Sequence, residues 1–102
     1  MSVLVTLKFS GDTDVFRKAI VDKADQLAKI AEDARQNGGG LHHQFGIGDG
    51  YVLVIDEWET VEDFQTFFAD PELQTLIGTM GADPDAPPEI TVAEAIDSPD
   101  KY

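Results

Sequence analysis

Hydrophobic and polar residues alternate at the beginning of the chain. Residues 3–9 carry a strongly hydrophobic side chain at each odd position, namely Val3, Val5, Leu7 and Phe9. This period of two predicts a β-strand with one buried face, because successive side chains of a strand point to opposite sides. Between residues 13 and 37 the hydrophobic positions follow a helical spacing instead. They predict one long amphipathic helix that ends at the glycines of residues 38–40.

Two further strands lie on either side of a short glycine-containing turn. Residues 41–47 predict the first of them, and Gly48-Asp49-Gly50 has the composition of a tight hairpin turn. Residues 51–58 predict the other strand, which begins with the hydrophobic run YVLVI. A strand that is hydrophobic on both sides is covered on both sides. Helices on one face of the sheet therefore leave its other face to a second layer.

The second half of the chain predicts another helical region and a final strand. Thr60, followed three residues later by Asp63, is typical of a helix N-cap. Asp70-Pro71 interrupts this helix and starts it again, because the residue before proline avoids helical geometry and proline fits a first turn. A proline-rich loop at residues 83–88 precedes a short last strand around residues 90–95.

The order of these elements is strand, helix, strand, strand, helix, strand, which predicts an α+β ferredoxin-like fold. In this fold the four strands form one antiparallel sheet, and two helices cover the same face. We expect a single domain over residues 1–96 and a C-terminal tail at residues 97–102. Because the third strand is also hydrophobic on its uncovered face, we expect a homodimer that forms through the sheet.

The chain of 102 residues is strongly acidic, with 20 Asp and Glu against 7 Lys and Arg and a formal net charge of −13. A surface of this sign repels the phosphates of nucleic acids and of anionic lipids, so we expect neither nucleic acid nor a membrane as partner. The absence of cysteine excludes disulfides and thiolate chemistry. The hydrophobic stretch at residues 3–9 is too short for a signal peptide, which leads us to expect a cytoplasmic protein.

The junction between the third strand and the following helix suggests a family. Residues 54–68 read VIDEWETVEDFQTFF. This segment resembles the corresponding junction of dimeric α/β-barrel proteins, especially the antibiotic biosynthesis monooxygenase-like group. That group includes cofactor-free oxygenases of polycyclic aromatic substrates, haem-degrading enzymes and proteins without an assigned activity. The resemblance therefore implies a fold, a dimeric α/β barrel, more specifically than it implies a function.

The same resemblance argues against the haem-degrading branch at three positions. When the chain is aligned on Trp58, the helix tryptophan of those enzymes corresponds to Phe67, and their haem-ligating histidine corresponds to Ile77. Their asparagine in the first strand has Thr6 as its nearest counterpart. We therefore expect no haem and no other cofactor. Cofactor-free oxygenation stays open, because it needs only an apolar pocket for an electron-rich substrate and one proton acceptor.

His42 and His43 are the only histidines of the chain and the candidates for proton transfer near neutral pH. Neighbouring residues of a strand point to opposite faces, so at most one of the two reaches a cavity. If His43 shares a face with Phe45, then His42 shares the other face with Gln44, and the sequence leaves open which face is internal. A structural or solvent-exposed role is the alternative for each histidine.

Several aromatic residues are candidates for contact with a ligand. The tryptophan at the end of the third strand is either a packing residue of the strand–helix junction or a surface on which a ligand stacks. The other aromatic residues are suited to line a pocket between the sheet and the second helical region, although their spacing fits a plain hydrophobic core equally well. The candidates are Tyr51, Trp58, Phe64, Phe67 and Phe68.

Acidic residues are concentrated around the end of the third strand, at Asp56, Glu57, Glu59, Glu62 and Asp63. They alternate between the faces of the strand and then enter a helix start, where carboxylates interact favourably with the helix dipole. We interpret this run as solvated surface and helix cap. The chain has no cysteine and no histidine pair at helical spacing, so no metal site is expected.

Three functions are compatible with these features. The first is a dimeric barrel that binds a small apolar or aromatic molecule and oxygenates it without a cofactor, with one histidine as proton acceptor. The second is a non-catalytic binding or assembly module of the same fold, in which the aromatic side chains fill the core. The third is an isomerase or lyase, which an inward-facing ionised acid such as Asp56 would favour.

Overall fold

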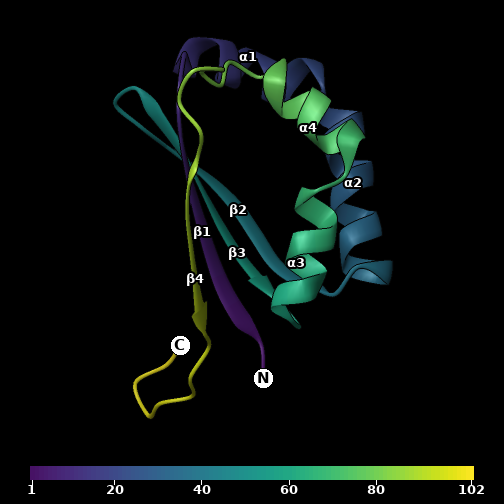
Figure 1. Ribbon diagram of the computed structural model, residues 1–102, viewed down its shortest axis with the longest axis vertical. Coiled ribbons are helices and arrows are strands. Elements are labelled where there is room, and N and C mark those ends of the chain that lie inside the picture. Colours follow the sequence, from purple (N-terminus) through teal and green to yellow (C-terminus); the bar gives the residue numbers. More distant parts are fainter.

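A computed structural model describes residues 1–102 as one antiparallel sheet with helices on one of its faces (Figure 1). The strands are β1 (Val3–Ser10), β2 (Gly40–Gly48), β3 (Tyr51–Trp58) and β4 (Glu89–Glu94). The helices are α1 (Thr13–Asp22), α2 (Ala24–Asn37), α3 (Val61–Phe68) and α4 (Pro71–Gly78). The strand order β2-β3-β1-β4 places β1 and β3 in the centre of the sheet and confirms the α+β ferredoxin-like fold.

The hairpin between β2 and β3 fixes the position of every side chain along these two strands. Its two-residue turn, Asp49-Gly50, has a positive φ of 78° at Gly50, which a residue without a side chain adopts readily. Gly48 pairs with Tyr51 across the turn, and the same register places His43 opposite Asp56. A bulge between Gly40 and His42 is the one irregularity of this ladder.

The first helical region is divided, which the sequence pattern did not predict. We expected one helix up to the glycines of residues 38–40, but Lys23, with φ −113° and ψ 21°, separates α1 from α2. The hydrophobic positions keep their helical spacing across this break, and neither glycine nor proline marks it. The sequence therefore contains no local signal for the division, which lets α1 and α2 take different directions above the sheet (Figure 1).

The second helical region begins twice, as predicted. The Thr60 hydroxyl accepts a hydrogen bond of 3.1 Å from the backbone N–H of Asp63 at the start of α3. The Asp70 carboxylate then accepts one of 2.8 Å from the N–H of Glu72, next to Pro71 in the first turn of α4. These caps satisfy backbone donors that have no partner within the helix. They fix α3 and α4 as two separate walls above the sheet.

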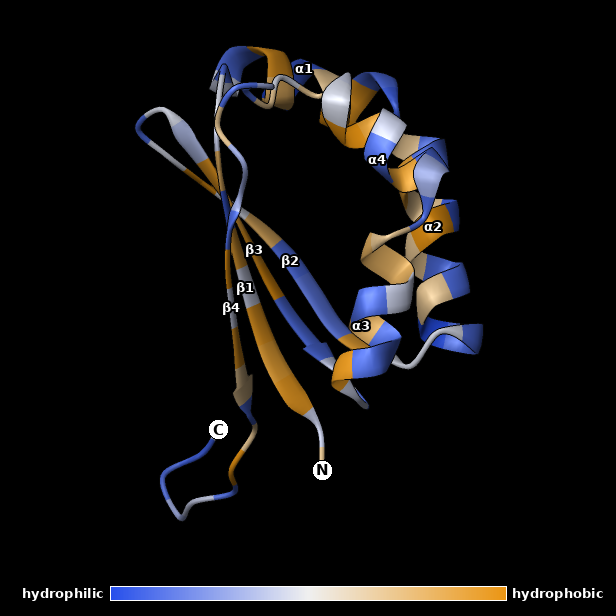
Figure 2. Cartoon of the chain, in the orientation of Figure 1, coloured by the Kyte–Doolittle hydropathy of each residue, from blue (hydrophilic) through white to orange (hydrophobic).

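The hydrophobic core lies between the sheet and the helices, and it is thin. Only 11 of the 102 residues are buried. One cluster joins β1 and β3 to α3, and a second joins α1, β3 and α4; Figure 2 shows the hydrophobic residues along β1 and β3 and on the helices. The first cluster contains Val5, Leu7, Val54, Trp58 and Phe64, and the second contains Phe16, Ala19, Val52, Leu76 and Met80. No helix has the length and hydrophobicity needed to cross a membrane.

Candidate functional site

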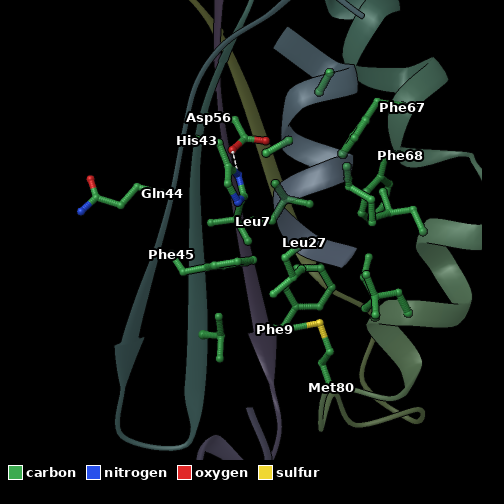
Figure 3. A pocket seen from close by; sticks show the side chains of 18 of the residues that line it. Leu7, Phe9, Leu27, His43, Gln44, Phe45, Asp56, Phe67, Phe68 and Met80 are labelled. Carbon is green, nitrogen blue, oxygen red and sulfur yellow. Dashed lines mark hydrogen bonds and ion pairs between the residues drawn. The ribbon is translucent and has the colours of Figure 1, made fainter. Parts of the chain in front are cut away.

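A cavity of about 570 Å³ lies between the inner face of the sheet and the helices. Of its 33 lining residues 23 are hydrophobic, so a ligand there would lie mostly against apolar side chains. β1, β2 and β3 form its floor, and all four helices contribute to its walls. Figure 3 shows Phe9, Leu27 and Met80 at one part of the cavity and Phe67 and Phe68 at another.

Asp56 is the buried polar residue of the cavity, with 4% of its surface exposed. The alternation of β3 places it on the same face as Val54 and Trp58, toward the helices. Our interpretation of the acidic run as solvated surface and cap is therefore wrong for this residue. Burying a carboxylate is costly unless it is hydrogen-bonded, and both oxygens of Asp56 are bonded to neighbouring side chains.

His43 makes the first of these bonds, with 2.7 Å between its Nδ1 and Oδ1 of Asp56 (Figure 3). The imidazole also packs edge-on against Phe45, at a distance of 4.7 Å between the ring centroids. With 46% of its side chain exposed, the ring belongs to the cavity wall and still reaches open space. It is thus held on one side and accessible on the other.

Trp58 makes the second bond, with 3.2 Å between its Nε1 and Oδ2 of Asp56. Only 3% of this tryptophan is exposed, and its ring centroid lies 4.9 Å from that of Phe67. The indole ring lines the cavity and is part of the first core cluster at the same time. The structure therefore confirms that Trp58 packs at the junction, and its contact with a ligand stays a prediction.

The remaining candidates divide between the two faces of the sheet. Phe64, Phe67 and Phe68 on α3 line the cavity, with Phe64 buried against Trp58. His42 and Gln44 are also among the lining residues, but His42 pairs with Glu57, which puts its side chain on the opposite face of β2 from His43. The side chain of Gln44 points away from the helices in Figure 3. Tyr51 is not among the lining residues; it lies at the start of β3 with the ammonium group of Lys8 4.5 Å from its ring centroid. The expectation that Tyr51 faces the pocket is not met, because odd positions of β3 point to the outer face.

The charged groups around the cavity are few. Besides Asp56, the lining includes Asp12 and the cation Arg35 at the end of α2. No group of three or more His, Cys, Asp or Glu side chains is arranged to hold a metal ion. The polar chemistry of the cavity is therefore concentrated at His43 and Asp56, close to Trp58.

The pairing of His43 with Asp56 was not predicted. The sequence predicted a turn at Gly48-Asp49-Gly50 after a strand that ends at residue 47. The observed two-residue turn, Asp49-Gly50, instead pairs Gly48 with Tyr51, and five positions further from the turn along each strand His43 pairs with Asp56. Asp56 lies two positions from Trp58 on β3 and therefore shares its inner face, and His43, which is paired with Asp56, points to the same face.

The arrangement joins an imidazole, a side chain that can act as a general base, to a buried carboxylate that holds it in place. Both face an apolar cavity, in which electrostatic interactions are stronger than in water. A ligand with an acidic hydroxyl or an activated C–H group would meet the imidazole there. The site is therefore suited to removing a proton from a bound, mostly hydrophobic molecule.

No protein-family model matches the sequence, and no curated protein matches it either. Solved structures do match its fold. SnoaB of Streptomyces nogalater, described as a cofactor-independent oxygenase, is 15% identical with a TM-score of 0.66, and the match covers 98% of each chain. The ActVA-Orf6 monooxygenase of Streptomyces coelicolor, solved with nanaomycin D, is 17% identical with a TM-score of 0.67, covering 95% of this chain and 89% of that one.

A third match is a protein of Deinococcus radiodurans named as a candidate antibiotic biosynthesis monooxygenase. It is 20% identical with a TM-score of 0.64, and the match covers 98% of each chain. All three structures share the fold over nearly the whole chain, which agrees with the resemblance seen at residues 54–68. At this level of identity they show the fold alone.

Proposed function

We propose that this chain binds a small apolar or aromatic molecule in the cavity and oxygenates it without a cofactor, with His43 taking the first proton. The observation that carries the proposal is the 2.7 Å bond between His43 and the buried Asp56 at the cavity wall. A core that needs only to be filled gains nothing from such a pair, since a buried carboxylate is costly to desolvate. The cavity of about 570 Å³ is also of the size that small-molecule sites have.

The proposed reaction converts an activated CH₂ group of the substrate to a carbonyl. Nε2 of His43 removes a proton, and the resulting carbanion transfers electrons to O₂, which then bonds to that carbon. The peroxide loses water as the second proton leaves the carbon, so that CH₂ and O₂ give C=O and H₂O. The fold supports this proposal, since SnoaB, which shares it, is described as a cofactor-independent oxygenase.

A second candidate is an isomerase or lyase that begins with the same proton transfer. The inward position of the Asp56 carboxylate favours it, because that acid is buried beside the base. In this reaction the carbanion is protonated at another atom or expels a leaving group, and O₂ is not consumed. Oxygen uptake therefore separates the two candidates.

The test is oxygen uptake with anthrone, whose CH₂ group is flanked by two aromatic rings, for the wild type, His43→Gln and His42→Gln. We expect one O₂ consumed for each carbonyl formed, and a loss of roughly 100- to 10,000-fold in rate for His43→Gln, the range typical of a general base. His42→Gln is the matched control, because His42 lies on the outer face. Equal rates for wild type and His43→Gln would exclude the proposed base. If anthrone and related polycyclic aromatic compounds do not bind, the alternative of a non-catalytic binding or assembly module is favoured.

We also propose that two copies associate through the outer face of the sheet. Leu4 and Ile55 on this face are 47% and 42% exposed, although they belong to the two central strands. Hydrophobic side chains in the centre of an otherwise uncovered sheet are typical of a surface that is buried in an assembly. A second copy supplies the same face in return, as a two-fold axis requires.

A further inference from the structure

Trp58, Asp56 and His43 form a chain of two hydrogen bonds along the inner face of β3 and β2. We infer that Trp58 holds the orientation of the Asp56 carboxylate, and that Asp56 thereby fixes the tautomer of His43, with the proton on Nδ1 and a free electron pair on Nε2. In this account Asp56 and Trp58 are positioning residues. The inference deepens the proposed function, since a base needs that free electron pair, but its test requires no substrate.

The direction of each hydrogen bond follows from the chemistry of the groups. The indole Nε1–H of Trp58 is only a donor, so Oδ2 of Asp56 must accept. A carboxylate offers only acceptors, so Nδ1 of His43, 2.7 Å from Oδ1, must carry its proton toward Asp56. A neutral imidazole has one N–H, and Nε2 is therefore the acceptor.

A plain core role of Trp58 would not need its N–H group. The ring alone packs against Phe64 and Phe67, and a phenylalanine would retain much of that contact. The N–H group is nevertheless bonded to the same carboxylate as the histidine, within a residue that is 3% exposed. Because its only N–H group is bonded to Asp56, the indole has no hydrogen-bond donor left for a ligand.

Asp56→Asn tests the inference because it makes the two ends of the side chain unequal. Trp58 can only donate, so it takes the amide oxygen and leaves the NH₂ group facing His43. That NH₂ group donates to Nδ1, which must then be unprotonated, and the proton moves to Nε2. The nearly isosteric variant should therefore invert the tautomer of His43.

Asp56→Asn with Trp58→Phe should reverse this effect. Without the indole N–H, the amide can turn its oxygen toward His43, and the Nδ1–H tautomer becomes favourable again. Trp58→Phe alone should leave the wild-type tautomer, since both ends of a carboxylate accept. A structural role of Trp58 predicts no such rescue.

The experiment is long-range ¹H–¹⁵N NMR of the imidazoles in the ¹⁵N-labelled full chain, at a pH where both histidines are neutral. His42→Gln assigns the two ring systems, and exposed His42 gives the tautomer ratio of an unconstrained ring. We expect Nδ1–H at His43 in the wild type, Nε2–H in Asp56→Asn, and a return toward Nδ1–H in the double variant. If the wild-type His43 has the same ratio as His42, or Asp56→Asn leaves it unchanged, the inference fails.

If the double variant does not fold, the indole proton of Trp58 in Asp56→Asn decides the point. It stays bonded to the amide oxygen and keeps the downfield chemical shift of a hydrogen-bonded N–H if the inference is correct, and this signal moves upfield if the amide is turned the other way. These measurements are made on the resting protein. The expected tautomers without oxygen uptake would refute the proposed oxygenation and leave this inference standing. Oxygen uptake without the expected tautomers would refute this inference and leave the proposed oxygenation standing.

Discussion

Ile55→Glu should dissociate the proposed dimer. Ile55 lies in the middle of the outer face of β3, opposite Thr6 of β1, and 42% of its surface is exposed in the single chain. Full burial of an isoleucine contributes about 1.5–3 kcal/mol, so burying the exposed 42% contributes roughly 0.6–1.3 kcal/mol per copy. A two-fold interface contains the residue twice, which doubles the loss to about 1.3–2.5 kcal/mol.

This loss alone raises the dissociation constant about 10- to 60-fold, since 1.4 kcal/mol corresponds to a factor of ten. Two carboxylates brought into the interface add a desolvation cost, so we expect a total effect of about 100-fold or more. Sedimentation equilibrium of the wild type and the variant measures it. Val21→Glu is the control, because Val21 is 74% exposed on α1 and receives the same change of charge. A monomeric wild type, or equal association of Ile55→Glu and wild type, would refute the reasoning.

Three further predictions concern the frame of the cavity. Thr60→Ala removes the N-cap of α3 and should lower the free energy of unfolding by about 1 kcal/mol, seen as a fall in Tm of roughly 4–8 °C; an unchanged Tm would contradict the role of the cap. Phe64→Ala removes a side chain that is 4% exposed and packs next to Trp58, and it should lower the free energy of unfolding in urea by about 3–5 kcal/mol. A smaller loss than that of Thr60→Ala would contradict the tight packing of Phe64. Gly81→Ala should destabilise, because Gly81 has φ +96° and an added Cβ would lie 2.7 Å from the carbonyl oxygen of Asp12. Gly78→Ala, in open space at the end of α4, should be neutral or stabilising by up to about 1 kcal/mol, and equal effects of both changes would contradict the described backbone.

The sequence predicts the sheet well because its signals are local. β3 begins and ends where the pattern places it, at Tyr51 and Trp58, since the glycine turn and the following hydrophobic run mark one end and the capping residue Thr60 follows the other. The restart at Asp70-Pro71 is equally local, because proline restricts the residue before it. The break at Lys23 has no such mark, and the positions on either side fit one continuous helix.

The site depends on a relation between strands, which composition does not reveal. Asp56 belongs to an acidic run, and most acidic residues are exposed, so its charge favoured a solvated position. Its position two residues from Trp58 on β3 and the pairing set by the hairpin turn indicate a buried position instead, because together they bring Asp56 next to His43 on the face that the helices cover. Where residue type and strand register disagree, the register is the stronger guide once one face of the sheet is buried.

The most direct test of the central claim is an NMR titration of the full chain with anthrone that follows the two imidazoles and the single indole. If the cavity beside the His43–Asp56 pair binds the ligand, the signals of His43 and Trp58 shift with saturation, while those of His42, whose side chain lies on the opposite face of β2, shift less. Shifts confined to His42 would contradict a binding site between the sheet and the helices. Phe67→Trp changes the volume of the cavity, so an unchanged affinity for anthrone in this variant, measured from the His43 shifts, would contradict it as well.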